Sequence, residues 1–91
     1  MRLKNNEVDI IKKTISNIFD DATVYLFGSR LDDTKKGGDI DLFIVAKNAT
    51  FSNKIKALAK LQRELHKPVD IVLHKDFSRS IEQEALKGIQ I

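Results

Sequence analysis

The sequence predicts an α+β fold in which helices flank a small mixed β-sheet, with the element order α-β-β-α-β-α. Two kinds of pattern indicate this class. Apolar residues recur at three- and four-residue steps over about residues 5–19 and 52–66, as in helices with one buried face. Short runs with the apolar, β-branched and aromatic composition of strands occupy residues 23–27, 39–46 and 69–74. Because these segments alternate along the chain, we expect the helices to cover the sheet.

The first predicted helix, residues 5–19, is followed by a strand, residues 23–27, and then by a turn. The helix carries one apolar stripe, formed by Val8, Ile11, Ile15, Ile18 and Phe19. Gly28 and Ser29 interrupt the strand, and the polar residues 30–38 are expected to form a loop.

The second predicted strand, residues 39–46, is apolar on both faces after Asp41, so it should lie inside the sheet with both faces covered. A second helix is predicted to follow, with Ser52 as N-cap and its end near His66, because Pro68 cannot continue it. Its expected buried stripe consists of Ile55, Leu58, Leu61 and Leu65.

The last elements are a third strand, residues 69–74, and a short helix to about Lys87. Ser80 and Gln83 have the spacing of a capping box at the start of this helix, and Gly88 suits the position after its end. The apolar C-terminus, residues 89–91, could pair as a short edge strand or enter an interface, and the sequence leaves both open.

Composition indicates an ordinary globular protein with one domain, residues 1–91. The 91 residues are 42% hydrophobic and 32% charged, with no cysteine, which excludes a disulfide framework and a thiolate metal site. The chain shows no apolar signal core and no membrane span, so we expect a cytoplasmic protein. The net charge of +3 favours acidic partners such as phosphates, but basic residues are too sparse for us to expect direct nucleic-acid binding.

Three aspartates stand out because they lie on predicted strands. Side chains alternate along a strand, so Asp39 and Asp41 share a face, with Cα atoms about 6.5–7 Å apart. Asp70 is the second residue of the third strand and joins them if the two strands are neighbours. Such oxygen ligands suit Mg²⁺ or Mn²⁺ better than zinc. An isolated D-x-D pair at the start of a strand is usually solvated and binds no metal. This pair is followed by an apolar strand, which makes it a better candidate for a metal site than an isolated pair.

The Gly28-Ser29 turn directly follows a strand. Glycine lets the backbone approach a ligand closely, and exposed N–H groups with the Ser29 hydroxyl can bind phosphate oxygens. Such a dipeptide alone is most often just a turn. Together with the aspartates, it supplies what nucleotide chemistry needs, a triphosphate site opposite a metal site.

These motifs resemble the DNA polymerase β-like nucleotidyltransferase superfamily, specifically its minimal nucleotidyltransferases. The resemblance rests on GSR at 28–30, GDIDLFIV at 38–45 and PVDIVL at 68–73. It implies the polymerase β-like fold, two Mg²⁺ ions held by Asp39 and Asp41, and a catalytic role for Asp70, which would bind the catalytic metal and help to deprotonate the acceptor hydroxyl.

The resemblance also implies a substrate and a partner. Gly28 and Ser29 would bind the β- and γ-phosphates of ATP, and Arg30 would either add positive charge there or be a solvated loop residue. Minimal nucleotidyltransferases of this size are similar to the antitoxins of HEPN/MNT pairs, which transfer AMP to a tyrosine of a HEPN-domain RNase (AMPylation). No second domain is expected in this chain, so another protein would supply part of the acceptor site.

Two alternatives stay open. The first is a non-catalytic antitoxin that neutralises a partner toxin by binding alone. The second is an RNA-binding domain that uses one basic helix face, formed by Lys56, Lys60, Arg63 and Lys67. An ordinary solvated face explains those four residues better, since no aromatic residues lie between them for base stacking.

Overall fold

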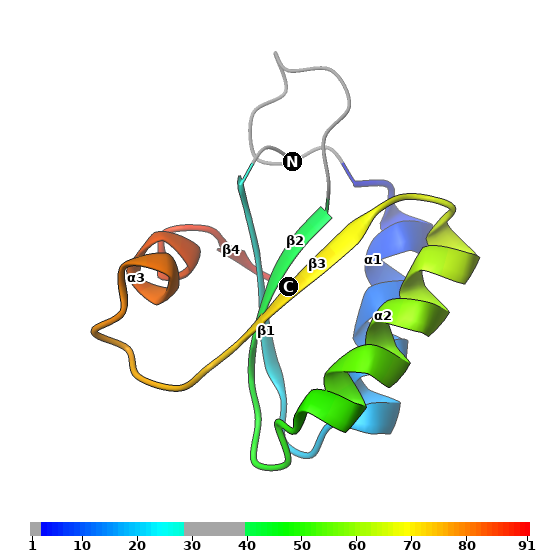
Figure 1. The fold of residues 1–91 in the computed structure, drawn as a ribbon. Coiled ribbons are helices and arrows are strands. Elements are labelled where there is room, and N and C mark those ends of the chain that lie inside the picture. Colours follow the sequence, from blue (N-terminus) through cyan, green and yellow to red (C-terminus); the bar gives the residue numbers. More distant parts are fainter. Residues whose placement is uncertain (1–2, 29–39) are drawn as a thin grey trace.

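The computed structural model describes residues 3–28 and 40–91, which form a four-stranded mixed sheet with three helices (Figure 1). The helices are α1 (Asn5–Ile18), α2 (Phe51–Leu65) and α3 (Ser80–Leu86). The strands are β1 (Thr23–Phe27), β2 (Ile40–Val45), β3 (Val69–Leu73) and β4 (Ile89–Gln90). The predicted fold class and the order of the predicted elements are confirmed, and β4 is added at the end.

The strands lie in the order β3-β2-β1-β4. β2 pairs antiparallel with β1 and parallel with β3, and β4 pairs antiparallel with the outer side of β1. β2 is therefore an inner strand. Its residues Leu42, Phe43 and Ile44 have no exposed surface, which confirms that an apolar run on both faces marks a strand covered on both sides.

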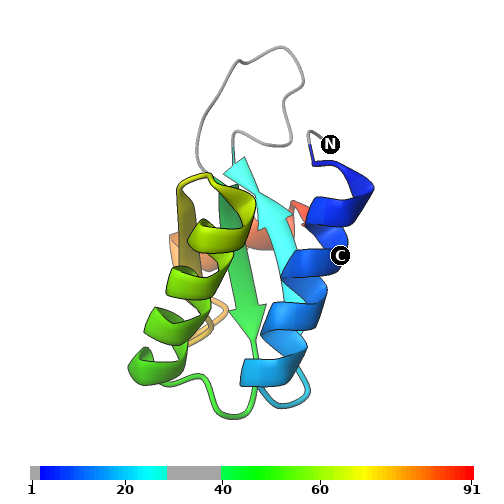
Figure 2. The same ribbon diagram turned by 90° about the vertical axis from the view of Figure 1, so that its right-hand side faces the viewer.

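Helices cover both faces of this sheet. α1 and α2 lie side by side on one face, and α3 lies on the other (Figures 1 and 2). The larger core fills the space under α1 and α2; its fully buried members include Ile11, Leu26, Leu42 and Leu61. A smaller cluster under α3 contains Phe27, Phe43 and Ala85. No helix in the described parts of the chain is long and apolar enough to cross a membrane.

Two predictions for α2 are wrong. Its N-cap is Thr50, whose side-chain oxygen accepts the Asn53 N–H at 3.1 Å, so Ser52 lies inside the first turn. Ile55 is 47% exposed because the buried face of α2 is centred on Ala57, Leu61 and Leu65. The apolar stripe is thus wider than the surface that the sheet and α1 cover.

The capping box predicted for α3 is also wrong. The N-cap is Arg79, which makes no side-chain capping bond, and Ser80 is the first helical residue. Gly88 does follow the end of the helix, but among the described glycines only Gly28 has a positive φ. Gly88 is needed because a Cβ there would overlap the carbonyl oxygen of Leu26.

The C-terminal residues pair with the sheet. β4 lies opposite Tyr25 and Leu26 of β1, and the Ile91 N–H donates to the carbonyl of Val24 at 2.9 Å. Of the two open alternatives for this segment, the edge strand is therefore the one that the structure bears out.

Candidate active site

Three strand ends meet at one end of the sheet and bring two of the predicted aspartates together. β1 ends at Phe27, directly before Gly28, while β2 and β3 begin there. Asp41 lies opposite Phe27 in the β1–β2 pair and opposite Asp70 in the β2–β3 pair. The two aspartates are therefore cross-strand neighbours, as expected if the strands that carry them adjoin.

Asp41 and Asp70 lie on the same face of the sheet. Residues directly opposite each other on paired strands point to the same side, and adjacent strands are about 5 Å apart. This is the α3 face, because Phe43, two residues beyond Asp41, belongs to the cluster under that helix. Asp41 is half-buried and Asp70 is exposed. A rigid inner strand thus carries one carboxylate, and the neighbouring strand presents the other to solvent.

Gly28 packs directly against the Asp41 carboxylate. Its φ of +79° lies in the left-handed region that favours glycine. A Cβ at this position would overlap Oδ2 of Asp41 and lie 3.1 Å from its Cγ. A side chain here would strain the backbone and would displace the Asp41 carboxylate. The approach of a ligand to the Gly28 backbone stays a prediction, and the neighbour that the structure places against this glycine is the Asp41 carboxylate.

Three other predicted site residues, Ser29, Arg30 and Asp39, lie outside the described residues, so their roles stay predictions. Within residues 3–28 and 40–91, no group of three or more His, Cys, Asp or Glu residues could hold a metal ion. The described part of the candidate site contributes a pair of carboxylates, Asp41 and Asp70. A third carboxylate for a metal would come from Asp39.

Neither histidine joins this pair. His74 lies four residues beyond Asp70, just after the end of β3. Its Nδ1 is 2.6 Å from Oε1 of Glu82, so its partner is Glu82 and not the aspartate pair. His66 ends α2 in a left-handed conformation, with φ +55°. Both histidines therefore lie outside the Asp41–Asp70 pair, and a metal site built from oxygen ligands stays a prediction.

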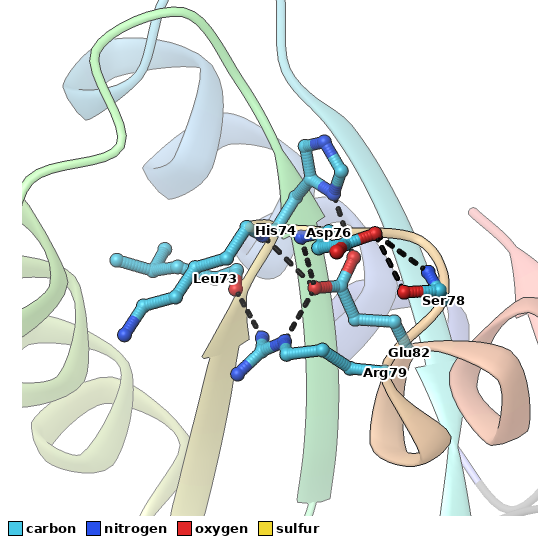
Figure 3. Close-up of polar contacts among 7 residues, drawn as sticks. Leu73, His74, Asp76, Ser78, Arg79 and Glu82 are labelled. Atoms are coloured by element: carbon cyan, nitrogen blue, oxygen red, sulfur yellow. Dashed lines mark hydrogen bonds and ion pairs between the residues drawn. The ribbon is translucent and has the colours of Figure 1, made fainter.

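A second polar cluster, centred on Glu82, was not predicted (Figure 3). Glu82 has no exposed surface, and its Oε2 accepts the backbone N–H groups of Lys75 and Asp76, both at 2.9 Å, and Nε–H of Arg79 at 2.7 Å. Oε1 faces His74. The cluster fixes the connection between β3 and α3. The three-residue spacing of Arg79 and Glu82 is the only trace of it in the sequence.

Burial raises the pKa of Glu82, but the contact with His74 and the donors from Lys75, Asp76 and Arg79 outweigh it and lower the pKa to about 2. The carboxylate is therefore ionised throughout the neutral range. Because all of its partners belong to the β3–α3 connection, Glu82 acts as a structural anchor at some distance along β3 from Asp70.

A second ion pair anchors the start of β3. Nζ of Lys67 lies 2.7 Å from Oε2 of the buried Glu7, and Oε1 of Glu7 accepts the Lys4 N–H at 3.0 Å. Burial raises the pKa of Glu7, but these two partners lower it overall. Lys67 lies beyond the end of α2 and forms an ion pair with Glu7. It is therefore not part of the basic helix face that was considered for RNA binding, which keeps three of its four residues.

Comparison with known families agrees with this arrangement. A family model described as "Polymerase beta, Nucleotidyltransferase" matches residues 5–91. The chain belongs to the polymerase β nucleotidyltransferase family. No curated protein matches the sequence. The domain is therefore one for nucleotidyl transfer, a class of enzyme that generally uses a nucleoside triphosphate and a divalent metal.

The described residues fit such a metal. Carboxylate oxygens are the ligands that Mg²⁺ prefers, and Asp41 and Asp70 lie opposite each other on neighbouring strands, on the same face of the sheet. The missing side chain at Gly28 leaves room for the Asp41 carboxylate itself. Asp41 and Asp70, with Asp39 as the predicted third ligand, would hold the metal.

Proposed function

We propose that this protein transfers AMP from ATP to a hydroxyl group of another protein. The observation that carries the proposal is the pairing of Asp41 with Asp70 at the sheet end where Gly28 leaves room for the Asp41 carboxylate. In this proposal Asp39, Asp41 and Asp70 are the catalytic and metal-binding residues. Gly28, Ser29 and Arg30 hold the triphosphate.

The reaction forms a bond between the acceptor oxygen and the α-phosphorus of ATP. The bond from the α-phosphorus to the bridging oxygen of the β-phosphate breaks, and pyrophosphate leaves. Asp70 takes the proton of the acceptor hydroxyl, for which its exposed position on the sheet face suits it. Asp39, Asp41 and Asp70 would hold Mg²⁺, two ions in this proposal, which when bound would lower the pKa of that hydroxyl and stabilise the leaving pyrophosphate.

The strands hold the reacting groups in place. Asp41 is followed by three residues without exposed surface, so its backbone cannot shift without disturbing the core. Such rigidity keeps a ligand carboxylate at a fixed position relative to Asp70, which metal-dependent transfer requires. The same paired carboxylates would have little use in a protein that acts by binding alone.

For the acceptor, we propose a tyrosine of a HEPN-domain RNase toxin, which this protein would silence as an antitoxin. The support is the resemblance of the short chain and its motifs to minimal nucleotidyltransferases. The competing function, neutralisation by binding alone, predicts that a toxin stays silenced when the carboxylates are removed.

The test is the intact mass of the product of the adjacent reading frame after incubation with this protein, ATP and Mg²⁺. We expect the mass of one or more AMP groups to be added by the wild type and by Asp9→Asn, a control at an exposed position of α1. Asp41→Asn and Asp70→Asn should add none. Modification that persists in either variant would refute the proposed roles. A stable complex without modification would favour neutralisation by binding.

A further inference from the structure

The outer edge of β3 is open to a further strand. β3 is the last strand on its side of the sheet formed by the described residues. The Ile40 N–H donates to the Pro68 carbonyl and the His74 N–H to the Ile44 carbonyl, so even-numbered residues of β3 bond toward β2. The odd-numbered residues, among them Ile71 and Leu73, therefore turn their backbone groups outward.

A groove of about 400 Å³ lies along this edge. The end of β3, from Ile71 to Leu73, lines it together with the two residues that follow, the first turn of α2 and the start of α3. Two exposed apolar side chains on these helices line the groove: Phe51, which is 72% exposed, and Ile81, which is 43% exposed. Ile55, one turn beyond Phe51, extends the apolar surface along α2. Apolar groups flanking an open strand edge are typical of sites that receive an extended peptide.

The charge of the groove is positive. Lys54 and Lys75 line it together with Arg79, which is paired with the buried Glu82, and none of its lining residues is acidic. Within the described residues, no carboxylate lies within 4.0 Å of either lysine's ammonium group. A second copy of this chain would bring the same cations together across a two-fold interface, whereas an acidic partner would complement them.

Arg79 closes one end of the groove. Its Nη2 donates to the Leu73 carbonyl at 2.9 Å, while its Nε–H donates to the buried Glu82 (Figure 3). The outward carbonyl of Leu73 is thus already used. Within the described residues, the outward backbone groups of Ile71 and Val69, in the direction of Asp70, make no backbone hydrogen bond to a further strand or loop.

We propose that this groove docks the acceptor protein, which adds an acidic, extended segment to β3 as a fifth strand. The inference rests on the proposed function, since it assigns the segment to the protein that is modified. Leu73 lies three residues from Asp70, about 10 Å along the strand. A residue of the added strand opposite Asp70 would point to the same face as Asp41 and Asp70. Docking would therefore select which hydroxyl reaches the carboxylates.

The first test is an amide NMR titration of the full chain with a defined probe. The probe is an acetylated eight-residue peptide that alternates glutamate with valine and carries one central tyrosine. We expect the largest shifts at Ile71, Leu73 and Phe51, with no comparable change at Gln90 of β4. A counterpart with lysine in place of glutamate, and one with prolines that remove the pairing N–H groups, should bind at least about tenfold more weakly.

The second test is transfer of labelled AMP from ATP to the same peptide. Phe51→Ser and the double variant Lys54→Glu/Lys75→Glu should each lower the rate by about tenfold or more. The controls are Ile89→Ser, an exposed isoleucine on β4, and Lys12→Glu/Lys13→Glu on α1; both should retain the wild-type rate. All variants should bind Mg·ATP like the wild type.

The outcomes separate this inference from the proposed function. Shifts at Ile71 and Leu73 without AMP transfer would support the docking edge and count against protein AMPylation. Transfer that the groove variants leave unchanged would support the activity and overturn the docking edge. Shifts centred elsewhere, no binding of the acidic peptide, or self-association through β3 would each overturn the inference.

Discussion

Replacing Gly28 with alanine is expected to weaken both the fold and the binding of Mg·ATP, for separate reasons. The φ of +79° is left-handed, which costs an L-residue about 1–2 kcal/mol. The new Cβ would also overlap Oδ2 of Asp41. That carboxylate ends a rotatable side chain, so it would turn away while the backbone stays in place. Displacing a metal ligand should lower the affinity for Mg·ATP by about tenfold or more.

The assay combines urea unfolding with calorimetric titration of Mg·ATP. Thr50→Ala is the control, because loss of this N-cap should cost a similar free energy, about 1 kcal/mol, far from the aspartates. Its affinity for Mg·ATP should equal that of the wild type. A double-mutant cycle with Asp41→Ala separates the cost of backbone strain from the cost of the overlap with the carboxylate. Without the carboxylate, Gly28→Ala should cost only the backbone strain.

Wild-type affinity for Mg·ATP in a folded Gly28→Ala protein would refute this reasoning. The contact between Gly28 and Asp41 would then have no part in ligand binding. An unfolding cost that stays the same in the Asp41→Ala background would show instead that the overlap contributes nothing to stability.

Three further predictions concern the anchors of the fold. The free energy of unfolding should fall as the pH drops from 4.5 toward 2, because Glu82 binds its proton with a pKa near 4.5 in the unfolded chain but about 2 in the folded one. Glu82→Gln should flatten that fall by about 1–3 kcal/mol in urea unfolding at acid pH; an unchanged slope would contradict the assigned partners. Ser52→Ala should change stability by less than about 0.5 kcal/mol, and a cost equal to that of Thr50→Ala would contradict the assigned cap. Lys67→Met should lower the free energy of unfolding by about 1 kcal/mol, since it leaves Glu7 buried without its cation; an unchanged melting temperature would show that the pair is not stabilising.

The strands that carry Asp41 and Asp70 could be predicted because strand periodicity and burial act locally. An apolar run on both faces requires an inner strand, which fixed the place of residues 40–45, and the same pattern after Asp70 marked its neighbour. That the two strands adjoin in parallel, with Asp41 opposite Asp70, depends on how the chain crosses over between them. The residue patterns predict the two strands, but only the chain topology makes those strands neighbours.

What could not be predicted depends on contacts between distant segments. Ile55 follows the helical apolar period, yet it is exposed because α2 lies over the edge of the sheet. Glu82 looks like an ordinary surface residue of a short helix until the β3–α3 connection brings its donors around it. Gly88 fits a helix end in sequence, while its actual constraint is the nearby carbonyl of Leu26. Each case requires the packing of other elements.

The most direct test of the candidate site locates the metal nucleotide by amide NMR, with Mn²⁺ in place of Mg²⁺ and a non-hydrolysable ATP analogue. Mn²⁺ broadens nearby signals, so the amides of Gly28, Asp41 and Asp70 should be lost first as Mn²⁺ is added, and Asp41→Asn should abolish the effect. The signals of Lys13 and Gln90 should broaden last. Broadening centred on any other part of the chain, or unchanged by Asp41→Asn, would contradict a metal-nucleotide site at these aspartates.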